Sequence, residues 1–211
     1  MRRTSPNAIR LTDPRALRAY AHPTRLALVG ALRSEGPLTA TRAGELLGES
    51  PASCSFHLRQ LAKYGLVEEV GSPRGRERPW RATALYTRLP KVTDTPQQAD
   101  ASRLLYRVLA ERYFDQVLRW LNRRGTEARA WQKAAHFGDE MLYLTAEELA
   151  ELRRQIDALL RSYRPRTTEP ARRPSGARLV TFLRLAFPWE DTRSRTPAAR
   201  GRKWRRPSRC E

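Results

Sequence analysis

The sequence predicts a mainly helical protein with a small β component, and three features lead to this fold class. Six segments between residues 13 and 163 combine a helix-start signal with apolar residues at three- and four-residue spacing. Residues 66–82 instead have the apolar, turn-separated pattern of a β-hairpin. The chain has 211 residues and 40% hydrophobic content, enough for one large domain or for a small domain with an extension.

Two short helices are expected first, after an N-terminal arm over residues 1–12. Asp13-Pro14 is a helix-start pair, with the aspartate as N-cap and the proline at the first helical position. His22-Pro23 interrupts the helix and begins the next one, which ends in the turn at residues 34–37. The expected apolar stripe of that second helix consists of Leu26, Leu28, Val29 and Leu32.

The stretch from residue 38 to residue 64 predicts two more helices joined by a tight turn. Thr39 is the expected N-cap of the first, and Gly48 ends it because glycine adopts the left-handed conformation without strain. Ser50 is the expected cap of the second, with Pro51 in its first turn. The predicted apolar face of the first helix is Ala43, Leu46 and Leu47.

The second of these helices has two distinct faces. Cys54, Leu58 and Leu61 recur at helical spacing and are expected inside. Two helices crossing at such a turn are either a helix-turn-helix, whose second helix suits the DNA major groove, or an ordinary helical hairpin in a core. The side chains expected to face outward are Ser53, Ser55, Phe56 and Arg59.

A β-hairpin is predicted directly after these helices. One strand begins at Leu66, a turn with two glycines and a proline occupies residues 71–75, and the returning strand contains Trp80. The tip is basic, which suits contact with phosphates or with the minor groove, although a solvated turn has the same composition. A helix-turn-helix followed by such a hairpin is a winged helix-turn-helix. The basic residues of the wing are Arg74, Arg76 and Arg78.

Residues 20–69, YAHPTRLALVGALRSEGPLTATRAGELLGESPASCSFHLRQLAKYGLVEE, resemble the winged helix-turn-helix domain of ArsR-type bacterial transcriptional regulators. The shared pattern includes His-Pro-x-Arg, Gly-Pro-Leu-Thr, Ser-x-Ser-x-His-Leu and Gly-Leu-Val, and the resemblance covers about residues 13–90. It implies a homodimeric repressor or activator that binds specific double-stranded DNA. It also implies a recognition helix that faces DNA through Ser50, Pro51, Ala52, Ser53, Ser55, Phe56 and Arg59.

Further contacts to DNA are expected around this helix. Arg59 is the best candidate for a bidentate contact to guanine. His57 matches the family's histidine and either contacts a phosphate or packs partly buried. Arg42, in the first helical turn, opposes the helix dipole at a cost of about 0.5 kcal/mol, which a DNA phosphate would offset, although a solvated arginine is the alternative. The expected phosphate or wing contacts are Arg42, His57, Lys63, Arg74, Arg76 and Arg78.

The sequence predicts neither a metal site nor an enzyme. Metal-sensing relatives of this type carry paired cysteines on the first helix of the motif, and Thr41–Leu47 has none. Cys54 fits a small buried hydrophobe, and its i, i+3 spacing from His57 supplies only two ligands. No nucleophile–base pair or phosphate loop is present. No cofactor is expected.

Residues 95–187 are predicted to form a helical extension for dimerisation and for a response to an effector. Thr95 and Gln98 form a capping box for a helix reaching Arg124, whose apolar residues cover two sides. Such a helix contacts either a second subunit or only its own domain. A second helix follows Thr145, and strands are expected at 140–144 and 178–187. The extension either binds an unidentified small molecule among its aromatic residues or only braces a dimer, which the lack of a convergent polar cluster favours.

The charge is unusual and unevenly distributed. The formal net charge is +19, whereas residues 96–164 carry 12 basic and 10 acidic groups and are nearly neutral. Residues 165–176 and the basic tail at 188–211 are rich in Pro, Arg, Ser and Thr and are expected to be disordered. A nucleoid protein that binds DNA without sequence choice is therefore the alternative function. No membrane span or signal peptide is predicted, so a cytoplasmic location at the nucleoid is expected.

Overall fold

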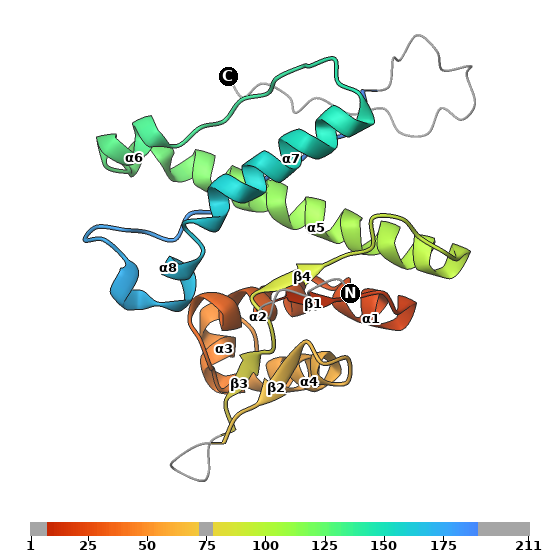
Figure 1. The fold of residues 1–211 in the computed structure, drawn as a ribbon. Coiled ribbons are helices and arrows are strands. Elements are labelled where there is room, and N and C mark those ends of the chain that lie inside the picture. Colours follow the sequence, from red (N-terminus) through yellow and green to blue (C-terminus); the bar gives the residue numbers. More distant parts are fainter. Residues whose placement is uncertain (1–7, 72–77, 190–211) are drawn as a thin grey trace, which may run out of the picture. The chain divides into compact units, whose positions relative to one another are not determined.

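A computed structural model of the chain describes residues 8–71 and 78–189 (Figure 1). The chain divides into two compact units, residues 1–179 and 180–211. Within the first unit the fold is mainly helical with a small β component. Its first part contains β1 (Ala8–Arg10), α1 (Pro14–Tyr20), α2 (Pro23–Ser34), α3 (Ala40–Leu47), α4 (Pro51–Ala62), β2 (Val67–Glu69), β3 (Trp80–Ala82) and β4 (Tyr86–Arg88). Its second part contains α5 (Pro96–Arg123), the 3-10 turn η1 (Arg124–Thr126), α6 (Arg129–Ala134), α7 (Ala146–Arg161), α8 (Pro165–Thr168) and η2 (Pro170–Arg172).

The predicted helix starts are confirmed by their capping hydrogen bonds. The side chain of each cap accepts a hydrogen bond from a backbone N–H in the first turn, so that one of the unpaired donors at the helix end is satisfied. Thr145 and Glu148 form a complete capping box at α7. At α5 the box is altered, because the Gln98 side chain accepts from the backbone N–H of Asp94 rather than that of Thr95. The caps are Asp13, Thr39, Ser50, Thr95 and Thr145.

The helix-turn-helix consists of α3 and α4, which pack directly on each other. Cys54, Leu58 and Leu61 on α4 are completely buried, as their spacing predicts. Gly48 ends α3 with φ at 68°, as expected of a left-handed cap. The expectation for Leu46 is wrong, because its side chain is 43% exposed. Since α3 has only eight residues and leans on α4 through Ala43 and Gly44, its opposite side stays at the surface.

The wing is a two-stranded antiparallel hairpin of β2 and β3, in which Val67 pairs with Ala82 and Glu69 with Trp80. Its returning strand is attached to the segment before α3, because Leu38 and Trp80 exchange two backbone hydrogen bonds of 2.9 and 2.8 Å. Trp80 is only 7% exposed. The base of the wing is therefore part of the core. The predicted tip residues Arg74 and Arg76 lie outside the described residues.

A second small sheet joins residues far apart in the chain. β1 pairs in parallel with β4, with Ile9 opposite Thr87, and the backbone N–H of Leu11 donates to the carbonyl of Arg88. Leu11 is buried in the main core. Part of the segment expected as an arm thus belongs to the folded unit. Three-residue strands are too short to give a readable alternation, which is why neither was predicted.

The long helix α5 is buried at its beginning and exposed over most of its length. It packs on α1, where Ala101 and Leu105 are completely buried. The Gln98 side chain donates to the backbone carbonyl of Thr12, which ties the start of α5 to the segment before α1. Val108 and Leu109 still pack partly buried against the core. Most of the remaining apolar side chains of α5 lie at the surface of the single chain, and the exposed ones are Leu104, Tyr106, Phe114, Leu118 and Leu121.

Three expectations for the extension are wrong. Residues 140–144 and 178–187 form no strand, and no pairing between them is found in the described part of the chain. Their nearly continuous apolar residues are typical of a buried strand, but a strand also needs a neighbouring backbone to pair with its N–H and C=O groups. Residues 165–176, expected to be disordered, contain the short helical turns α8 and η2.

Candidate nucleic-acid interface

Helix α4, the predicted recognition helix, presents an outer face on the side opposite its buried residues. Cys54, Leu58 and Leu61 fix its inner side, so the residues between them point outward. Phe56 is 48% exposed, and Arg59 is also exposed. Ser53 and Ser55 are half-buried. At the start of the helix, three of the residues expected at DNA are exposed, namely Ser50, Pro51 and Ala52.

A concave surface of about 600 Å³ lies between the start of α3, the outer side of α4 and the wing. Four of the residues singled out from the sequence line it together, although they come from three elements and are as far as 36 positions apart. The same surface includes two carboxylates, Glu45 and Glu69, and the buried Trp80 at its base. The four residues from the sequence analysis are Arg42, Ser55, Arg59 and Arg78.

The arginines of this surface are held by weak local contacts. Arg59 donates to the hydroxyl of Ser55 at 3.1 Å, one helical turn earlier. Arg42 forms an ion pair of 2.7 Å with Glu45, and both side chains are more than half exposed. Exposed pairs of this kind contribute about 0.2–0.5 kcal/mol, so both guanidinium groups can exchange them for a phosphate or a base.

Two further expected contacts lie outside this surface. Lys63 is exposed at the C-cap of α4 and does not line the concave surface. The side chain of His57 turns toward α2 instead. Its ring stacks on that of His22 with centroids 4.6 Å apart, and its Nδ1 accepts a hydrogen bond of 3.3 Å from Nε of Arg25. Of the two roles considered for His57, the packing role is the one that the geometry supports.

A small polar cluster surrounds this histidine pair. Arg25 also donates to the backbone carbonyl of Ala19, and Thr24 donates to Glu49 at 3.2 Å. Burial, followed by the charge of Arg25, lowers the pKa of His22. Burial, followed by the nearby His22 and Arg25, lowers the pKa of His57. The pairing of His22 and Arg25 with His57 was not predicted, because side-chain pairing between two helices leaves no periodic signal in the sequence.

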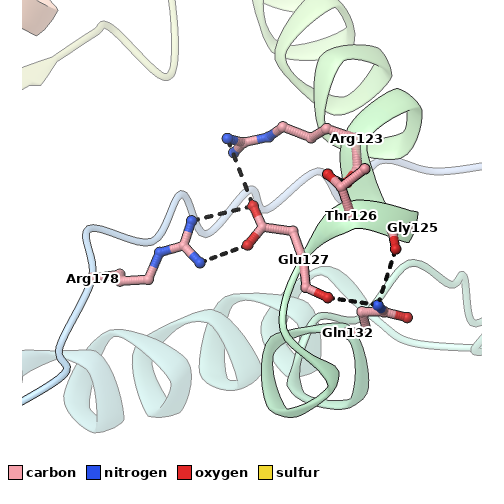
Figure 2. A network of polar contacts seen from close by, with 6 residues as sticks. All are labelled: Arg123, Gly125, Thr126, Glu127, Gln132 and Arg178. Carbon is pink, nitrogen blue, oxygen red and sulfur yellow. Dashed lines mark hydrogen bonds and ion pairs between the residues drawn. The ribbon is translucent and has the colours of Figure 1, made fainter.

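A second polar network lies just after the end of α5, around Glu127 (Figure 2). Glu127 accepts from Arg178 at 2.7 and 3.2 Å and lies 3.7 Å from Arg123, while the Arg178 guanidinium lies over the Trp131 ring. These hydrogen bonds and charges lower the pKa of Glu127. Gln132 donates to the backbone carbonyls of Gly125 and Glu127. The network fixes Arg178 beside Trp131 of α6.

The described part of the chain gives little support to metal binding, thiol reactivity or a membrane span. Among residues 8–71 and 78–189, no three His, Cys, Asp or Glu side chains are grouped as metal ligands. Burial raises the pKa of the Cys54 thiol, so it stays protonated under α4. No described helix has the length and apolar character that crossing a membrane requires.

The comparison with protein families places a helix-turn-helix domain at residues 20–70. This range contains α2, α3, α4 and β2, and therefore the helices that carry the concave surface. The chain thus contains a helix-turn-helix domain within a mainly helical, winged fold. No curated protein matches the sequence.

Three solved structures have a limited similarity to the chain. The PcaV regulator from Streptomyces coelicolor, in complex with its natural ligand, is 18% identical, with a TM-score of 0.29 over 66% of this chain and 74% of its own. A MarR mutant from E. coli complexed with operator DNA is 16% identical, with a TM-score of 0.29 over 70% and 84%. RV1404 from Mycobacterium tuberculosis is 16% identical, with a TM-score of 0.28 over 70% and 82%. At such scores the domain assignment rests on residues 20–70.

Proposed function

We propose that this chain is a transcriptional regulator of the ArsR-like winged helix-turn-helix type, which binds a specific double-stranded DNA sequence. The observation that carries this proposal is the concave surface between α3, α4 and the wing, where Arg42, Ser55, Arg59 and Arg78 converge. A major groove accepts a helix, and basic side chains around that helix neutralise the neighbouring phosphates. Such a role places the protein in the cytoplasm at the nucleoid, with no enzymatic activity.

The proposed binding mode divides the contacts by chemistry. Arg59, exposed on the outer side of α4, reads guanine through two hydrogen bonds. Phe56 offers an apolar edge to thymine methyl groups, and the serines bond either a base or a phosphate. Arg42 and Arg78 contact phosphates from the two rims of the concave surface, and thereby fix the register of the helix on the duplex. Lys63, Arg74 and Arg76 are assigned to phosphates as well.

We also propose that the active form is a homodimer bound to an inverted repeat. In the single chain, Phe114 and Leu118 on α5 are each 58% exposed, and an apolar face of this kind is usually covered by a partner. The near neutrality of residues 96–164 permits two copies to approach there. In the dimer the two α4 helices would enter successive major grooves, about 34 Å apart. Any small-molecule effector of this extension is unidentified.

Selection of bound duplexes from a random library tests the proposal. The selection is made at physiological salt with the full chain and with a chain ending at Trp189, which lacks the basic residues 190–211. An inverted repeat enriched by both chains is the expected result, with a preference over random DNA of about 10³–10⁷. Deletion of the tail is expected to flatten the salt dependence and to leave the selected sequence unchanged.

The same experiment tests the alternative of a nucleoid protein, which the net charge of +19 favours. Binding by charge alone would give no enriched sequence with either chain and would disappear steeply as salt rises. That outcome would overturn the proposal of a specific regulator.

A further inference from the structure

We propose that Arg25, His57 and His22, here called the histidine brace, position the recognition helix for DNA and do so only while both imidazoles are neutral. The proposal rests on the proposed DNA-binding function and adds a positioning role and a pH response to it. None of the three side chains lines the concave surface that is proposed to face DNA. Their effect on DNA would therefore be indirect, through the placement of α4.

The brace connects three elements through one set of side chains. Arg25 on α2 donates to the carbonyl of Ala19 in α1 and, through Nε, to Nδ1 of His57 on α4. His22, at the N-cap of α2, stacks on His57 with an interplanar angle of 35°. The middle of α4 is thus held against the corner between α1 and α2 by a hydrogen bond and a ring contact.

The hydrogen bond from Arg25 requires a neutral His57. A nitrogen that accepts from a guanidinium must carry a lone pair, so we assign the single ring proton of His57 to Nε2. Protonation would convert Nδ1 into a donor that points at another donor. His22 does not offset the loss of this hydrogen bond, because its own Nδ1 is buried without a hydrogen-bond partner in the described structure. An added proton on either ring therefore places a second positive charge beside Arg25.

The charged and titratable groups near the two imidazole rings come from α2, from the turn between α3 and α4, and from α4 itself. Arg25 opposes protonation of both rings, and His22 opposes protonation of His57. Among the described residues, the carboxylate that favours protonation is that of Glu49, in the turn before α4. Cys54, three residues before His57 on the same helix, has a raised pKa and stays neutral. Burial is the largest influence on both histidines, and the pKa of each is lowered below 6.5.

The direction of the pH response follows from these pKa values. A base with a lowered pKa in the folded state binds fewer protons there than in the unfolded chain. The stabilisation of the braced state is therefore complete above pH 6.5 and decreases as the pH falls from 6.5 through the lowered values. Acid should thus loosen α4 against α2.

The histidine brace should affect the contacts to DNA bases more than the general attraction to DNA phosphates. Phe56, the residue before His57, packs edge-on against the His57 ring at 5.3 Å and is exposed toward the proposed DNA side. A shift of α4 would move Phe56 and Arg59 away from the bases. Phosphate attraction, in contrast, depends on total charge and increases slightly when histidines gain protons. The ratio of specific to random DNA binding is therefore the quantity that isolates the brace.

The test compares the wild type with His57→Asn and His136→Asn over pH 5.5–7.5, using the selected operator and a random duplex of equal length. Asparagine at position 57 keeps an acceptor near the place of Nδ1 and cannot gain a proton. In the wild type we expect the specific-to-random ratio to fall about tenfold toward pH 5.5, the equivalent of one pKa unit. His57→Asn should fall threefold or less, and His136→Asn, altered at an exposed position, should follow the wild type.

A second readout needs no DNA. Amide hydrogen exchange of the free protein should show that α4 loses protection between pH 7.5 and 5.5, after correction for intrinsic exchange rates, and that His57→Asn suppresses this loss. An equal loss in wild type and His57→Asn, or no loss in the wild type, would overturn the brace. If no operator is selected, the proposed function fails while the exchange measurement still decides for or against the brace.

Discussion

Gly44 lies where α3 comes close to the backbone of the turn that leads into α4. A Cβ atom added there would stand 2.6 Å from the backbone carbonyl oxygen of Glu49 and 3.4 Å from the nitrogen of Pro51. Neither atom can move without displacing the turn that leads into α4. The position therefore requires glycine for lack of space, and not for an unusual backbone angle.

We expect Gly44→Ala to destabilise the protein. Overpacking of this kind costs about 1–3 kcal/mol, which exceeds the gain of about 1 kcal/mol from placing alanine in a helix. Thermal and urea unfolding measure the change. Gly30→Ala is the matched control, because the added Cβ meets only the flexible end of Arg112, at 3.1 Å. Equal midpoints for Gly44→Ala and wild type would contradict the packing account.

Arg59 is the residue on which proposed base recognition depends most. Arg59→Ala should reduce affinity for the selected operator by about 1–3 kcal/mol and relax the preference at one base pair. Arg42→Ala should weaken operator and random DNA alike, because a phosphate contact carries no sequence information. Competition titrations with both duplexes separate the two effects. An equal loss on both duplexes for Arg59→Ala would reassign Arg59 to a phosphate.

Helical spacing alone was sufficient to place Arg59 and Ser55 on the outside of α4 and Cys54 inside. It was insufficient for the histidine brace and for Leu46. The periodicity of one helix indicates which side is buried, but not which side chain of another helix meets it. The convergence of Arg42 and Arg78 on one surface likewise depends on how the wing returns to Leu38, which is a tertiary contact.

At the scale of elements, capping residues were the most reliable sequence signal and short strands the least. A cap is a local hydrogen bond, so Thr39, Ser50 and Thr145 determine their helix starts without help from the remainder of the fold. A strand of three residues gains its hydrogen bonds only from a distant partner. This is why β1 and β4 were missed and why the apolar residues at 140–144 were overinterpreted.

The wing depends on one anchoring side chain, Trp80. Trp80→Ala should lower the free energy of unfolding by about 3–5 kcal/mol, since it removes a large buried side chain next to Leu38. Denaturant unfolding followed by circular dichroism measures the loss. Trp189→Ala, at a position that is 73% exposed, is the control and should have little effect. A small loss for Trp80→Ala would mean that the hairpin is dispensable to the core.

At the scale of the whole molecule, the helix-turn-helix half is packed and the extension is largely exposed. Buried apolar residues stop at Leu105 within the described structure, whereas α7 keeps an amphipathic pattern with no completely buried residue. The proposed dimer, in which two copies share the extension, would cover these exposed faces. Single-chain sequence patterns predict such faces but not their partner.

The proposed dimer predicts that a charge on the exposed face of α5 separates the subunits. Leu118→Glu would bury an uncompensated carboxylate between two copies, at a cost of about 3–5 kcal/mol. Sedimentation velocity should then show monomers at concentrations where the wild type is dimeric. Gln116→Glu adds the same charge on the opposite side of the helix and should preserve the dimer. A dimer retained in Leu118→Glu would place the interface elsewhere.

The complete burial of Cys54 on the inner side of α4 also offers a way to measure how often the helix-turn-helix opens. Its protonated, covered thiol can react with a labelling reagent only when α4 separates from α2 and α3. In a Cys210→Ser background, the rate of labelling therefore reports how often the native protein opens at this place. Operator DNA bound to the outer side of α4 would slow the labelling of Cys54. The ratio of the labelling rates without and with DNA would measure how strongly DNA stabilises the closed helix-turn-helix.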